Sequence, residues 1–417
     1  MNRPHMNGPM NRIVIVGAGE CGARAAFGLR EKGYQGEITL IGAEPHLPYE
    51  RPPLSKEGMA EQRGPKHIAH ADRYLSAGIK VFTDAAVEGI DRGAKTVRIA
   101  DGRELSYDRL LLATGASPRH FPGQPQATPL FLTLRTHADA EAIRAKLAPG
   151  STLAIIGGGF IGLELAATAR KLGAEVVLLE GLPRVLSRGV PEEIAAVVAE
   201  RHRLQGVDIR CNARIVGIEA REKRAHIQLG DGDSLVADLV VVGIGAVPNT
   251  ALAEASGLVV DNGIAVDETL CTSDPNIFAA GDCCSFPLGH YGGRRIRLEA
   301  WRNAQDQGTL AAANLMGAAE PIASVPWFWS DQYDLTLQIA GLAEGAVTTV
   351  RRDLGDGAFI LFHLDASGRL ISASGIGKGN AVARDIRLAE MLIAAGKRPS
   401  PQALGSTETK LKALLAA

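Results

Sequence analysis

One glycine pattern occurs twice in this chain. Residues 13–22 read IVIVGAGECG and residues 153–162 read LAIIGGGFIG, so each copy is a short apolar run that ends in GxGxxG. An Ala-rich stretch that is compatible with a helix follows each copy, and a second apolar run comes after it. This order predicts two Rossmann-like units with parallel strands, although two βαβ units with purely structural glycines are an alternative. We expect the helices and second strands at 23–32 and 37–41 in the first copy, and at 163–172 and 175–179 in the second.

The residue types in this pattern suit a dinucleotide. Glycines allow a tight turn and let the backbone approach a pyrophosphate, while the helix N-terminus offers unpaired N–H groups to the anion. An acidic residue near the end of the second strand accepts hydrogen bonds from a ribose, and Glu44 and Glu180 follow the two motifs at about the expected 20 residues. The candidate residues are Gly17, Gly19, Gly22 and Glu44 in the first site and Gly157, Gly159, Ile161, Gly162 and Glu180 in the second.

Two sites in one chain imply two different dinucleotides. The simplest pair is a flavin dinucleotide and a nicotinamide dinucleotide, one of which accepts hydride from the other. Glu180 favours NADH over NADPH, because a carboxylate bonds a 2′-hydroxyl but repels a 2′-phosphate. Arg184 and Arg188 lie nearby and weaken this preference, unless they contact only pyrophosphate or ribose.

Three further apolar runs end in turns that would return the chain to such a site. They are residues 110–119 (LLLATGASPR), 240–249 (VVVGIGAVPN) and 276–283 (NIFAAGDC). In the last of them the Asp282 carboxylate can accept hydrogen bonds from the ribityl or ribose hydroxyls of a flavin, although a helix-capping role is also open. The other candidate residues in these turns are Thr114, Gly115 and Gly245.

The character of the chain changes after about residue 325. Residues 325–332 read VPWFWSDQ and hold two of the three tryptophans, a density that indicates either a local core or a functional cluster. The following pattern predicts a small α+β C-terminal domain, with strands at 335–342, 358–364 and 370–373 and a helix at 385–395.

Charge and cysteine content limit the possible functions. Lys and Arg number 45 against 46 Asp and Glu, so the net charge of −1 argues against nucleic-acid binding. No apolar run is long enough for a membrane span, and residues 1–11 read as a loose polar tail rather than a secretory signal. The five cysteines have neither metal-ligand nor CxxC spacing, which predicts unpaired thiols, a cytoplasmic location and no metal site.

Taken together, these residues resemble the pyridine-nucleotide-dependent flavoprotein reductases. More narrowly, they are similar to the ferredoxin reductases of bacterial oxygenase systems, the putidaredoxin reductase and biphenyl dioxygenase ferredoxin reductase types. The segments that carry the resemblance are YERPPLSK (49–56), LTLRT (132–136), NIFAAGDC (276–283) and PWFWSDQ (326–332).

The resemblance implies an α/β, glutathione-reductase-like fold with two Rossmann-like domains and a small α+β C-terminal domain. Its FAD-binding domain would be discontinuous, with the NADH-binding domain inserted between its two pieces. The expected boundaries are 11–117 and 246–324 for FAD, 118–245 for NADH and 325–417 for the C-terminal domain.

The resemblance also implies roles for single residues. Lys56 would lie near flavin N5 and pair with Glu164, although a surface position for Lys56 and a polar interface lining for Glu164 are the plainer alternatives. Trp329 would lie at the flavin edge, where electrons leave. Val87 would hold the adenine through its backbone, and Trp301 would begin a helix that faces the flavin. The other implied cofactor contacts are Arg51, Arg135, Asp282 and Arg188.

The implied function is hydride transfer from NADH to FAD, followed by single-electron transfer to a 2Fe–2S ferredoxin. That partner would be acidic and transiently bound, and it would serve a Rieske-type or haem-thiolate P-450-type oxygenase. Disulfide reductases of the wider superfamily carry a CxxxxC pair near the first helix, but residues 11–59 here hold only Cys21, so electrons would leave directly from the flavin. Residues 292–297 (GGRRIR) form the densest basic cluster and are either the docking surface or a solvated face.

Two other functions remain open on the same scaffold. One is a rubredoxin or monodehydroascorbate reductase, which would differ only in its electron acceptor. The other is an NADH-sensing interaction protein like apoptosis-inducing factor, in which NADH binding would drive a partner switch.

Overall fold

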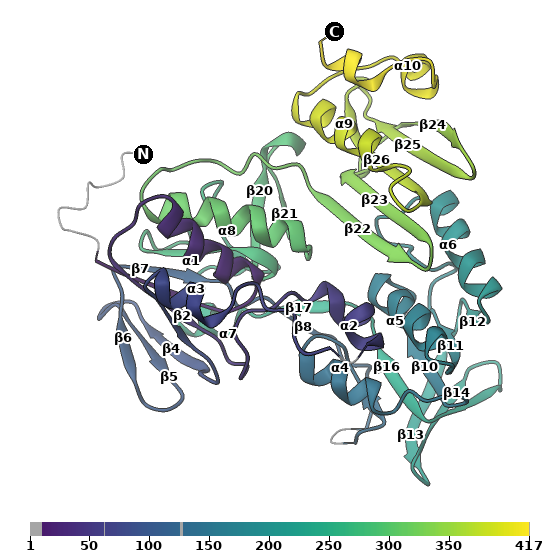
Figure 1. Cartoon of the computed structure of the whole chain (residues 1–417), viewed down its shortest axis with the longest axis horizontal. Coiled ribbons are helices and arrows are strands. Elements are labelled where there is room, and N and C mark those ends of the chain that lie inside the picture. The colour runs from purple at the N-terminus through teal and green to yellow at the C-terminus, as the bar shows by residue number, and fades with distance from the viewer. Residues whose placement is uncertain (1–10, 62, 126–127, 417) are drawn as a thin grey trace. The chain divides into compact units, whose positions relative to one another are not determined.

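The computed structural model describes residues 11–61, 63–125 and 128–416, so residues 1–10 of the N-terminal tail expected at 1–11 lie outside the described residues. The chain divides into two compact units, which are described separately (Figure 1). The chain crosses between them five times, and two of these crossings fall in β8 (Ala116–Pro118) and β17 (Ala246–Pro248). The first unit holds residues to Glu50, Pro65–Ala116 and Pro248–Ser324; the second holds Arg51–Gly64, Ser117–Val247 and Val325–Ala417.

The first unit is built on a five-stranded parallel sheet with the order β19-β7-β1-β2-β3. Its strands are almost wholly apolar, as expected for a parallel sheet that is buried on both faces. They are β1 (Arg12–Val16), β2 (Glu37–Ile41), β3 (Ile79–Phe82), β7 (Arg109–Leu112) and β19 (Ile277–Ala279).

Helices and two small sheets complete the first unit. The helices are α1 (Glu20–Glu31), α3 (Ala71–Ser76), α7 (Ala251–Ala255) and α8 (Trp301–Leu315), with 3₁₀ turns η2 (Gly281–Cys283) and η3 (Gly289–Tyr291). The small-sheet strands are β4 (Val87–Asp91), β5 (Thr96–Ile99), β6 (Glu104–Ser106), β18 (Ile264–Ala265), β20 (Cys284–Leu288) and β21 (Arg294–Ile296).

The second unit has a parallel sheet with the order β12-β11-β10-β16-β9, which repeats the first sheet except that the edge strand β9 comes first in the chain, whereas β19 comes last. A three-stranded antiparallel meander (β13–β15) comes directly before β16 in the chain, as the meander β4–β6 comes directly before β7 in the first unit. The repeated topology is that of a duplicated Rossmann-like unit, so the predicted fold class is confirmed. The strands are β9 (Phe131–Leu132), β10 (Thr152–Ile156), β11 (Glu175–Leu179), β12 (Val207–Arg210), β13 (Ile215–Arg221), β14 (Arg224–Leu229), β15 (Ser234–Ala237) and β16 (Leu239–Val242).

One 3₁₀ turn and four helices belong to this part of the second unit within the described residues. They are η1 (Pro52–Ser55), α2 (Glu57–Ala60), α4 (His137–Arg144), α5 (Phe160–Lys171) and α6 (Glu192–Leu204). α5 begins at Phe160 and α1 at Glu20, three residues before the predicted starts, because the last residues of each GxGxxG motif already form the first helical turn.

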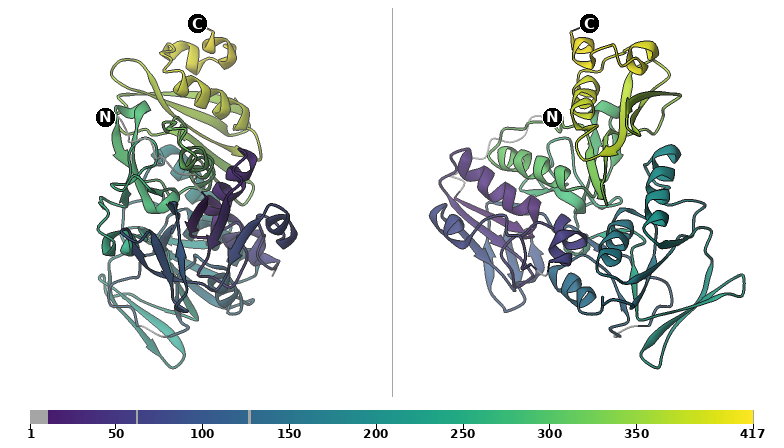
Figure 2. Two further views of the ribbon diagram at one scale, coloured as in Figure 1. Left: turned by 90° about the vertical axis from the view of Figure 1, so that its left-hand side faces the viewer. Right: turned by 45° about the vertical axis from the view of Figure 1, so that its right-hand side comes forward.

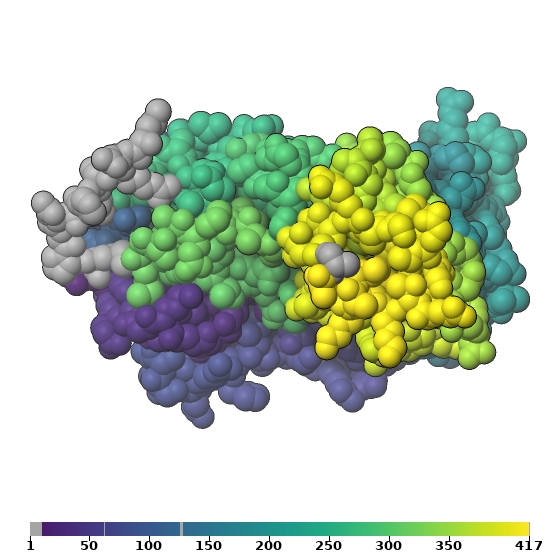
Figure 3. Space-filling view, turned by 90° about the horizontal axis from the view of Figure 1, so that it is seen from above, coloured from purple at the N-terminus to yellow at the C-terminus, as the bar shows by residue number. Residues whose placement is uncertain are grey.

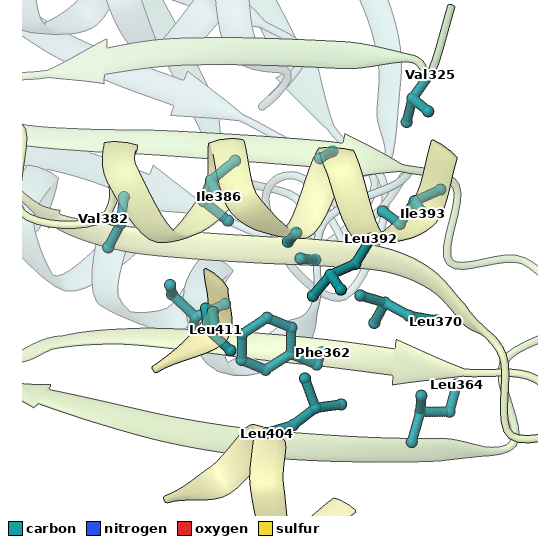
Figure 4. Close-up of a cluster of buried hydrophobic side chains, with 14 of the residues drawn as sticks. Val325, Phe362, Leu364, Leu370, Val382, Ile386, Leu392, Ile393, Leu404 and Leu411 are labelled. Atoms are coloured by element: carbon teal, nitrogen blue, oxygen red, sulfur yellow. The ribbon is translucent and has the colours of Figure 1, made fainter. Parts of the chain in front are cut away.

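The C-terminal segment of the second unit is a five-stranded antiparallel sheet with α9 (Ala383–Ala394) packed across one face (Figures 1 and 2). Phe362 and Leu370 of the sheet and Ile386 and Leu392 of α9 meet in one buried cluster (Figure 4). Leu404 and Leu411 near the C-terminal end add to this cluster, while other residues of this end form part of the surface in Figure 3. The elements are β22 (Trp327–Gln332), β23 (Leu335–Gly341), β24 (Thr348–Gly355), β25 (Ala358–Leu364), β26 (Leu370–Lys378), α10 (Pro401–Gly405) and η4 (Leu411–Leu415).

Two differences from the predicted C-terminal domain have a physical reason. β26 runs to Lys378 rather than Ala373, and its second half, SGIGK, lacks the apolar pattern of a strand. A Cβ at Gly375 would lie 3.0 Å from Val382 Cβ, so the close approach of α9 requires a small residue there. β24 was not predicted, since its residues TTVRRDLG are mostly exposed and polar.

Candidate functional site

The first glycine turn is closed on one side and open on the other. Gly17 has a φ of 114°, and a Cβ on it would lie 2.0 Å from the Ala113 carbonyl oxygen. A Cβ on Gly22 would lie 2.0 Å from the Gly17 oxygen, whereas one on Gly19 would meet no described atom within 4 Å. The turn therefore packs tightly at its first and third glycines and leaves space at the second, directly before the N-terminus of α1.

The second glycine turn repeats this geometry. Gly157 has a φ of 110°, and its Cβ would lie 2.4 Å from the Gly243 oxygen, while a Cβ on Gly162 would lie 2.3 Å from the Gly157 oxygen. A Cβ on Gly159 would have only the Gly243 oxygen near it, at 4.0 Å. Ile161, in the first turn of α5, is 48% exposed. Both turns thus present an uncrowded helix N-terminus, which fits the pyrophosphate of a dinucleotide.

The two predicted acidic residues are held by hydrogen bonds. Glu180 accepts the Gly158 N–H at Oε2 (2.7 Å) and the Leu182 N–H at Oε1 (2.8 Å), which fixes its carboxylate beside the second glycine turn. Glu44 accepts the hydroxyl of Tyr49. Each acid therefore lies after its β2 or β11 strand with a defined orientation.

The two arginines near Glu180 differ. The Arg184 guanidinium donates to the backbone oxygens of residues 185, 186 and 190, so it is committed to its own loop. Arg188 reaches the return turn, because a Cβ on Gly245 would lie 3.8 Å from its Nη1. Arg188, rather than Arg184, is thus the arginine that lies beside a predicted cofactor residue.

In the first unit, the turn after β7 is tied to the residue after β17. Thr114 Oγ1 donates to the Asn249 oxygen (2.7 Å), and Asn249 Nδ2 donates to the Thr114 oxygen (2.8 Å). The Asn249 N–H donates to the Gly115 oxygen (3.0 Å). These mutual hydrogen bonds fix the shape of the predicted turn.

The remaining predicted FAD contacts of the first unit occupy element ends. Asp282 lies in η2, and its backbone oxygen accepts from Arg297 Nη1 at 3.4 Å. Trp301 begins α8, as predicted, and Val87 begins β4. The contacts of these residues with a flavin remain predictions.

Lys56 and Glu164 form an ion pair in the second unit. Lys56 Nζ lies 3.3 Å from Glu164 Oε1, and the two side chains are only 15% and 9% exposed. Glu164 Oε2 accepts the Ser55 hydroxyl at 2.6 Å, and Oε1 accepts the Ser330 hydroxyl at 2.6 Å. Because both carboxylate oxygens have donors, the buried charge of Glu164 is compensated.

Trp329 borders this pair. Lys56 Nζ lies 5.3 Å from the Trp329 ring centroid and 3.6 Å from Asp331 Oδ2. The Trp329 indole N–H donates to Asp331 Oδ2 at 3.2 Å, and its ring stacks on Trp327 with centroids 5.5 Å apart. The three predicted catalytic residues are therefore brought together in one unit, with the ammonium group close to an aromatic ring.

Arg51 and Arg135 also meet in this unit. Arg51 Nη1 donates to the Arg135 backbone oxygen at 2.6 Å. The Arg135 N–H donates to Asp139, which also forms a capping box with Thr136 at the start of α4. The two predicted FAD-contacting arginines thus connect two separate loops, one before η1 and the other before α4.

The cysteines are free thiols throughout the described residues. Cys21 is buried in the first glycine turn, and burial raises its pKa well above the ordinary value, as it also raises that of Cys284. Such thiols are poor nucleophiles. Within the described ranges, no group of three His, Cys, Asp or Glu side chains could hold a metal ion, and no helix has the length and hydropathy of a membrane span.

The basic segment at residues 292–297 makes several internal contacts. Arg295 donates to the backbone oxygens of Ser285 (2.6 Å) and Val266 (3.0 Å), and Arg297 pairs with Glu299. These contacts favour a structural role for both side chains, so the docking role predicted for the segment gains no support from them.

The sequence interpretation missed four residues of the Lys56–Glu164 cluster: Ser55, Ser330, Gln332 and His202. The first three lie inside segments that carried the resemblance, where a buried hydroxyl or amide could have been flagged. His202 lies in α6, and nothing in its local sequence distinguishes it from a surface histidine.

Two Rossmann-like sheets with two open glycine turns define a protein that binds two dinucleotides. The pyridine nucleotide-disulphide oxidoreductase model matches residues 11–308, and the reductase C-terminal model matches residues 327–415. The chain therefore belongs to the pyridine nucleotide-disulphide oxidoreductase family, and the resemblance predicted from the sequence is confirmed.

Two relatives are similar to this chain along nearly its whole length. The anthranilate 1,2-dioxygenase system ferredoxin–NAD(+) reductase component of Burkholderia cepacia is 42% identical over 406 residues, 97% of this chain and 99% of the relative. Putidaredoxin reductase of Pseudomonas putida is 38% identical over 416 residues, 98% of this chain and 97% of the relative.

Solved structures of ferredoxin reductases are also similar to this chain. A covalent putidaredoxin reductase–putidaredoxin complex matches with a TM-score of 0.92 and 38% identity, covering 97% of this chain and 98% of that chain. The ferredoxin reductase for the CYP199A2 system from Rhodopseudomonas palustris matches with a TM-score of 0.91 and 37% identity, covering 97% and 99% of the two chains.

Proposed function

We propose that this chain is an FAD-dependent NADH:ferredoxin reductase that supplies an oxygenase through a 2Fe–2S ferredoxin. The observation that carries the proposal is its likeness, over 97% of its length, to a named ferredoxin–NAD(+) reductase component of a dioxygenase system. The two repeated glycine turns support it independently, because such a reductase needs two dinucleotide sites.

The first unit takes FAD and the second takes NADH. Bound FAD supplies the chemistry that the side chains lack, since it accepts a hydride and releases electrons one at a time. Gly17, Gly19 and Gly22 hold the FAD pyrophosphate at the N-terminus of α1, and Glu44 receives its ribose. The proposed NADH contacts in the second unit are Gly157, Gly159, Ile161, Gly162, Glu180, Arg188 and Gly245.

The other predicted contacts orient the flavin. Lys56, held by Glu164, supplies a fixed positive charge for its reactive edge, and the N-terminus of the helix that begins at Trp301 supplies partial positive charge. The other proposed flavin contacts are Arg51, Val87, Thr114, Gly115, Arg135 and Asp282.

Electrons would leave bound FAD without a protein dithiol. This step is supported by the five free cysteines, which leave no disulfide within the described residues. Trp329 is the proposed exit, and the proposed partner is an acidic ferredoxin that docks transiently. The free cysteines also support a cytoplasmic location, which remains a proposal.

The domain boundaries expected from the sequence belong to the same proposal. Residues 11–117 and 246–324 would form the FAD-binding domain, 118–245 the NADH-binding domain and 325–417 the C-terminal reductase domain. The retention of each cofactor by variants of the two glycine turns tests this assignment.

Steady-state reduction of cytochrome c, with and without a 2Fe–2S ferredoxin, tests the function. We expect rapid NADH-dependent turnover only when ferredoxin is present. Turnover with rubredoxin or monodehydroascorbate instead would assign a different acceptor. Negligible turnover with every acceptor, together with a long-lived complex of NAD⁺ and reduced flavin, would point to an NADH sensor.

A further inference from the structure

A second layer of buried polar side chains lies behind Glu164. Ser330 Oγ donates to Glu164, Gln332 Nε2 donates to Ser330 Oγ at 2.8 Å, and Gln332 Oε1 lies 2.9 Å from His202 Nε2. Ser330 and His202 are 0% exposed and Gln332 is 1% exposed. These side chains therefore form a continuous chain of hydrogen bonds from α6, through β22, to α5.

The direction of this chain follows from its charged end. An ionised Glu164 can only accept, so the Ser330 hydroxyl must give it its only proton. Ser330 Oγ can then only accept from Gln332, which requires that Gln332 present its NH₂ group to Ser330 and its carbonyl oxygen to His202. His202 must therefore donate from Nε2, and its Nδ1 carries no proton.

The surroundings of His202 agree with this direction. Its Nδ1 has no hydrogen-bond partner among the described residues, which suits a nitrogen without a proton. The Tyr333 ring packs edge-on against the imidazole with centroids 4.9 Å apart. Burial lowers the pKa of His202 to about 4, so the imidazole is neutral at physiological pH and has one proton to donate.

The position of His202 is fixed by the packing of its helix. The neighbouring Arg201 pairs with Asp334 at 3.0 Å, and Arg351 of β24 pairs with Glu193 at the start of α6. These contacts hold α6 against the C-terminal sheet of the same unit. The imidazole is therefore kept in place for its hydrogen bond to Gln332.

We propose that Gln332 and His202 are positioning residues for the Lys56–Glu164 pair. They fix the Ser330 hydroxyl as a donor to Glu164 and so hold that carboxylate in place opposite Lys56. The importance of the pair for hydride transfer rests on the proposed function, whereas the direction of the hydrogen-bond chain does not.

Two substitutions of Gln332 separate this role from simple packing. Gln332→Glu keeps the shape but cannot donate to Ser330, so a second carboxylate competes for the single hydroxyl proton. Gln332→Met keeps the volume and leaves Ser330 free to donate to Glu164. We expect Gln332→Glu to slow flavin reduction by NADH about tenfold, the effect of weakening one hydrogen bond to a charged group. Gln332→Met removes the amide but adds no competing acceptor, so it should slow flavin reduction clearly less than Gln332→Glu does.

The tautomer of His202 gives a second readout that does not depend on activity. In ¹⁵N-labelled holoenzyme, two-bond ¹H–¹⁵N correlations identify which imidazole nitrogen carries the proton, and His202→Gln assigns the signal by its loss. We expect a neutral imidazole protonated at Nε2. Because Gln can also donate to Gln332, His202→Gln should reduce flavin at nearly the unsubstituted rate.

Each result bears on the proposal. A His202 protonated at Nδ1, equal slowing by Gln332→Glu and Gln332→Met, or no slowing by Gln332→Glu would overturn it. If Gln332→Glu does not fold, the tautomer in the unsubstituted protein still decides. A protein with the expected tautomer and flavin reduction that fails to reduce any ferredoxin would contradict the proposed function and leave this inference standing.

Discussion

Lys56 Nζ lies 3.3 Å from Glu164 Oε1, and the same carboxylate accepts hydrogen bonds from the hydroxyls of Ser55 and Ser330. The pair is largely buried, so each charge depends on the other for its stability. We propose that this arrangement fixes the position of the Lys56 ammonium group, so that no solvent has to reorganise around it during hydride transfer.

Removing the carboxylate should expose this dependence. We expect Glu164→Ala to lower the rate constant of flavin reduction by roughly 10- to 100-fold, because Lys56 then has the half-exposed Asp331 as its anionic partner among the described residues. Anaerobic stopped-flow spectroscopy with NADH measures this constant. Glu219→Ala, which removes an exposed partner of Arg221, is the matched control and should be silent. An unchanged rate in Glu164→Ala would contradict the proposed role of the pair.

Alanine substitutions at the open glycines should separate the two cofactor sites. A Cβ at Gly19 meets no described atom within 4 Å, so Gly19→Ala should fold but should lose about tenfold or more in FAD affinity through its clash with the pyrophosphate. Gly159→Ala should keep FAD and raise the KM for NADH. Flavin content after purification and NADH kinetics measure both effects. The opposite pattern would reverse the cofactor assignment of the two units.

Coenzyme preference should depend on Glu180. We expect a higher kcat/KM for NADH than for NADPH. Because Glu180→Gln no longer repels a 2′-phosphate, the NADH-to-NADPH ratio of kcat/KM should fall about tenfold in this variant. Glu175→Gln, at the exposed start of β11, serves as the control. Equal kcat/KM values for the two coenzymes in the unsubstituted protein would contradict the ribose argument.

Stability should fall as the solution becomes mildly acidic. Burial lowers the pKa of His363 to about 4, as it does for His202, against an ordinary value of about 6.5. The unfolded chain therefore binds protons that the folded chain does not, and the free energy of unfolding decreases between pH 6.5 and 4 by at most about 3 kcal/mol per histidine. We expect the thermal midpoint to fall over this interval, and to fall less steeply in His363→Gln. Identical slopes for the two proteins would show that His363 does not titrate in this way.

Charge reversal at Arg295 should act on stability rather than on docking. Its guanidinium donates to two backbone oxygens, so Arg295→Glu loses both hydrogen bonds and should cost about 1–3 kcal/mol. Differential scanning calorimetry measures this loss, and the KM for ferredoxin should not change. A large rise in that KM, with an unchanged melting temperature, would restore the segment as a docking surface.

The sequence predicted the duplicated core because each copy of the motif combines three independent signals: apolar strands, glycines at fixed spacing and an acid near the next strand end. Gly17 and Gly157 show why the spacing is informative, since no larger residue fits between the turn and the neighbouring strand. The predicted end of β26 was less accurate. Gly375 interrupts the apolar pattern of this strand, and it is required there because the start of α9, a later part of the chain, packs against it.

The polar cluster could be predicted only in part. Lys56, Glu164 and Trp329 were found through the resemblance, and the structure brings them together. His202 and Gln332 are separated by 130 residues, and only tertiary packing makes them hydrogen-bond partners. No local periodicity in the sequence carries that information.

The central claim is that the two nucleotide sites of this chain exchange a hydride directly, without a protein thiol. Anaerobic mixing of the purified flavoprotein with NADH, before and after alkylation of its accessible thiols, tests this claim most directly. We expect the absorbance of oxidised flavin to disappear within one catalytic turnover in both samples. A flavin that NADH does not reduce, or one whose reduction is lost after alkylation, would contradict it.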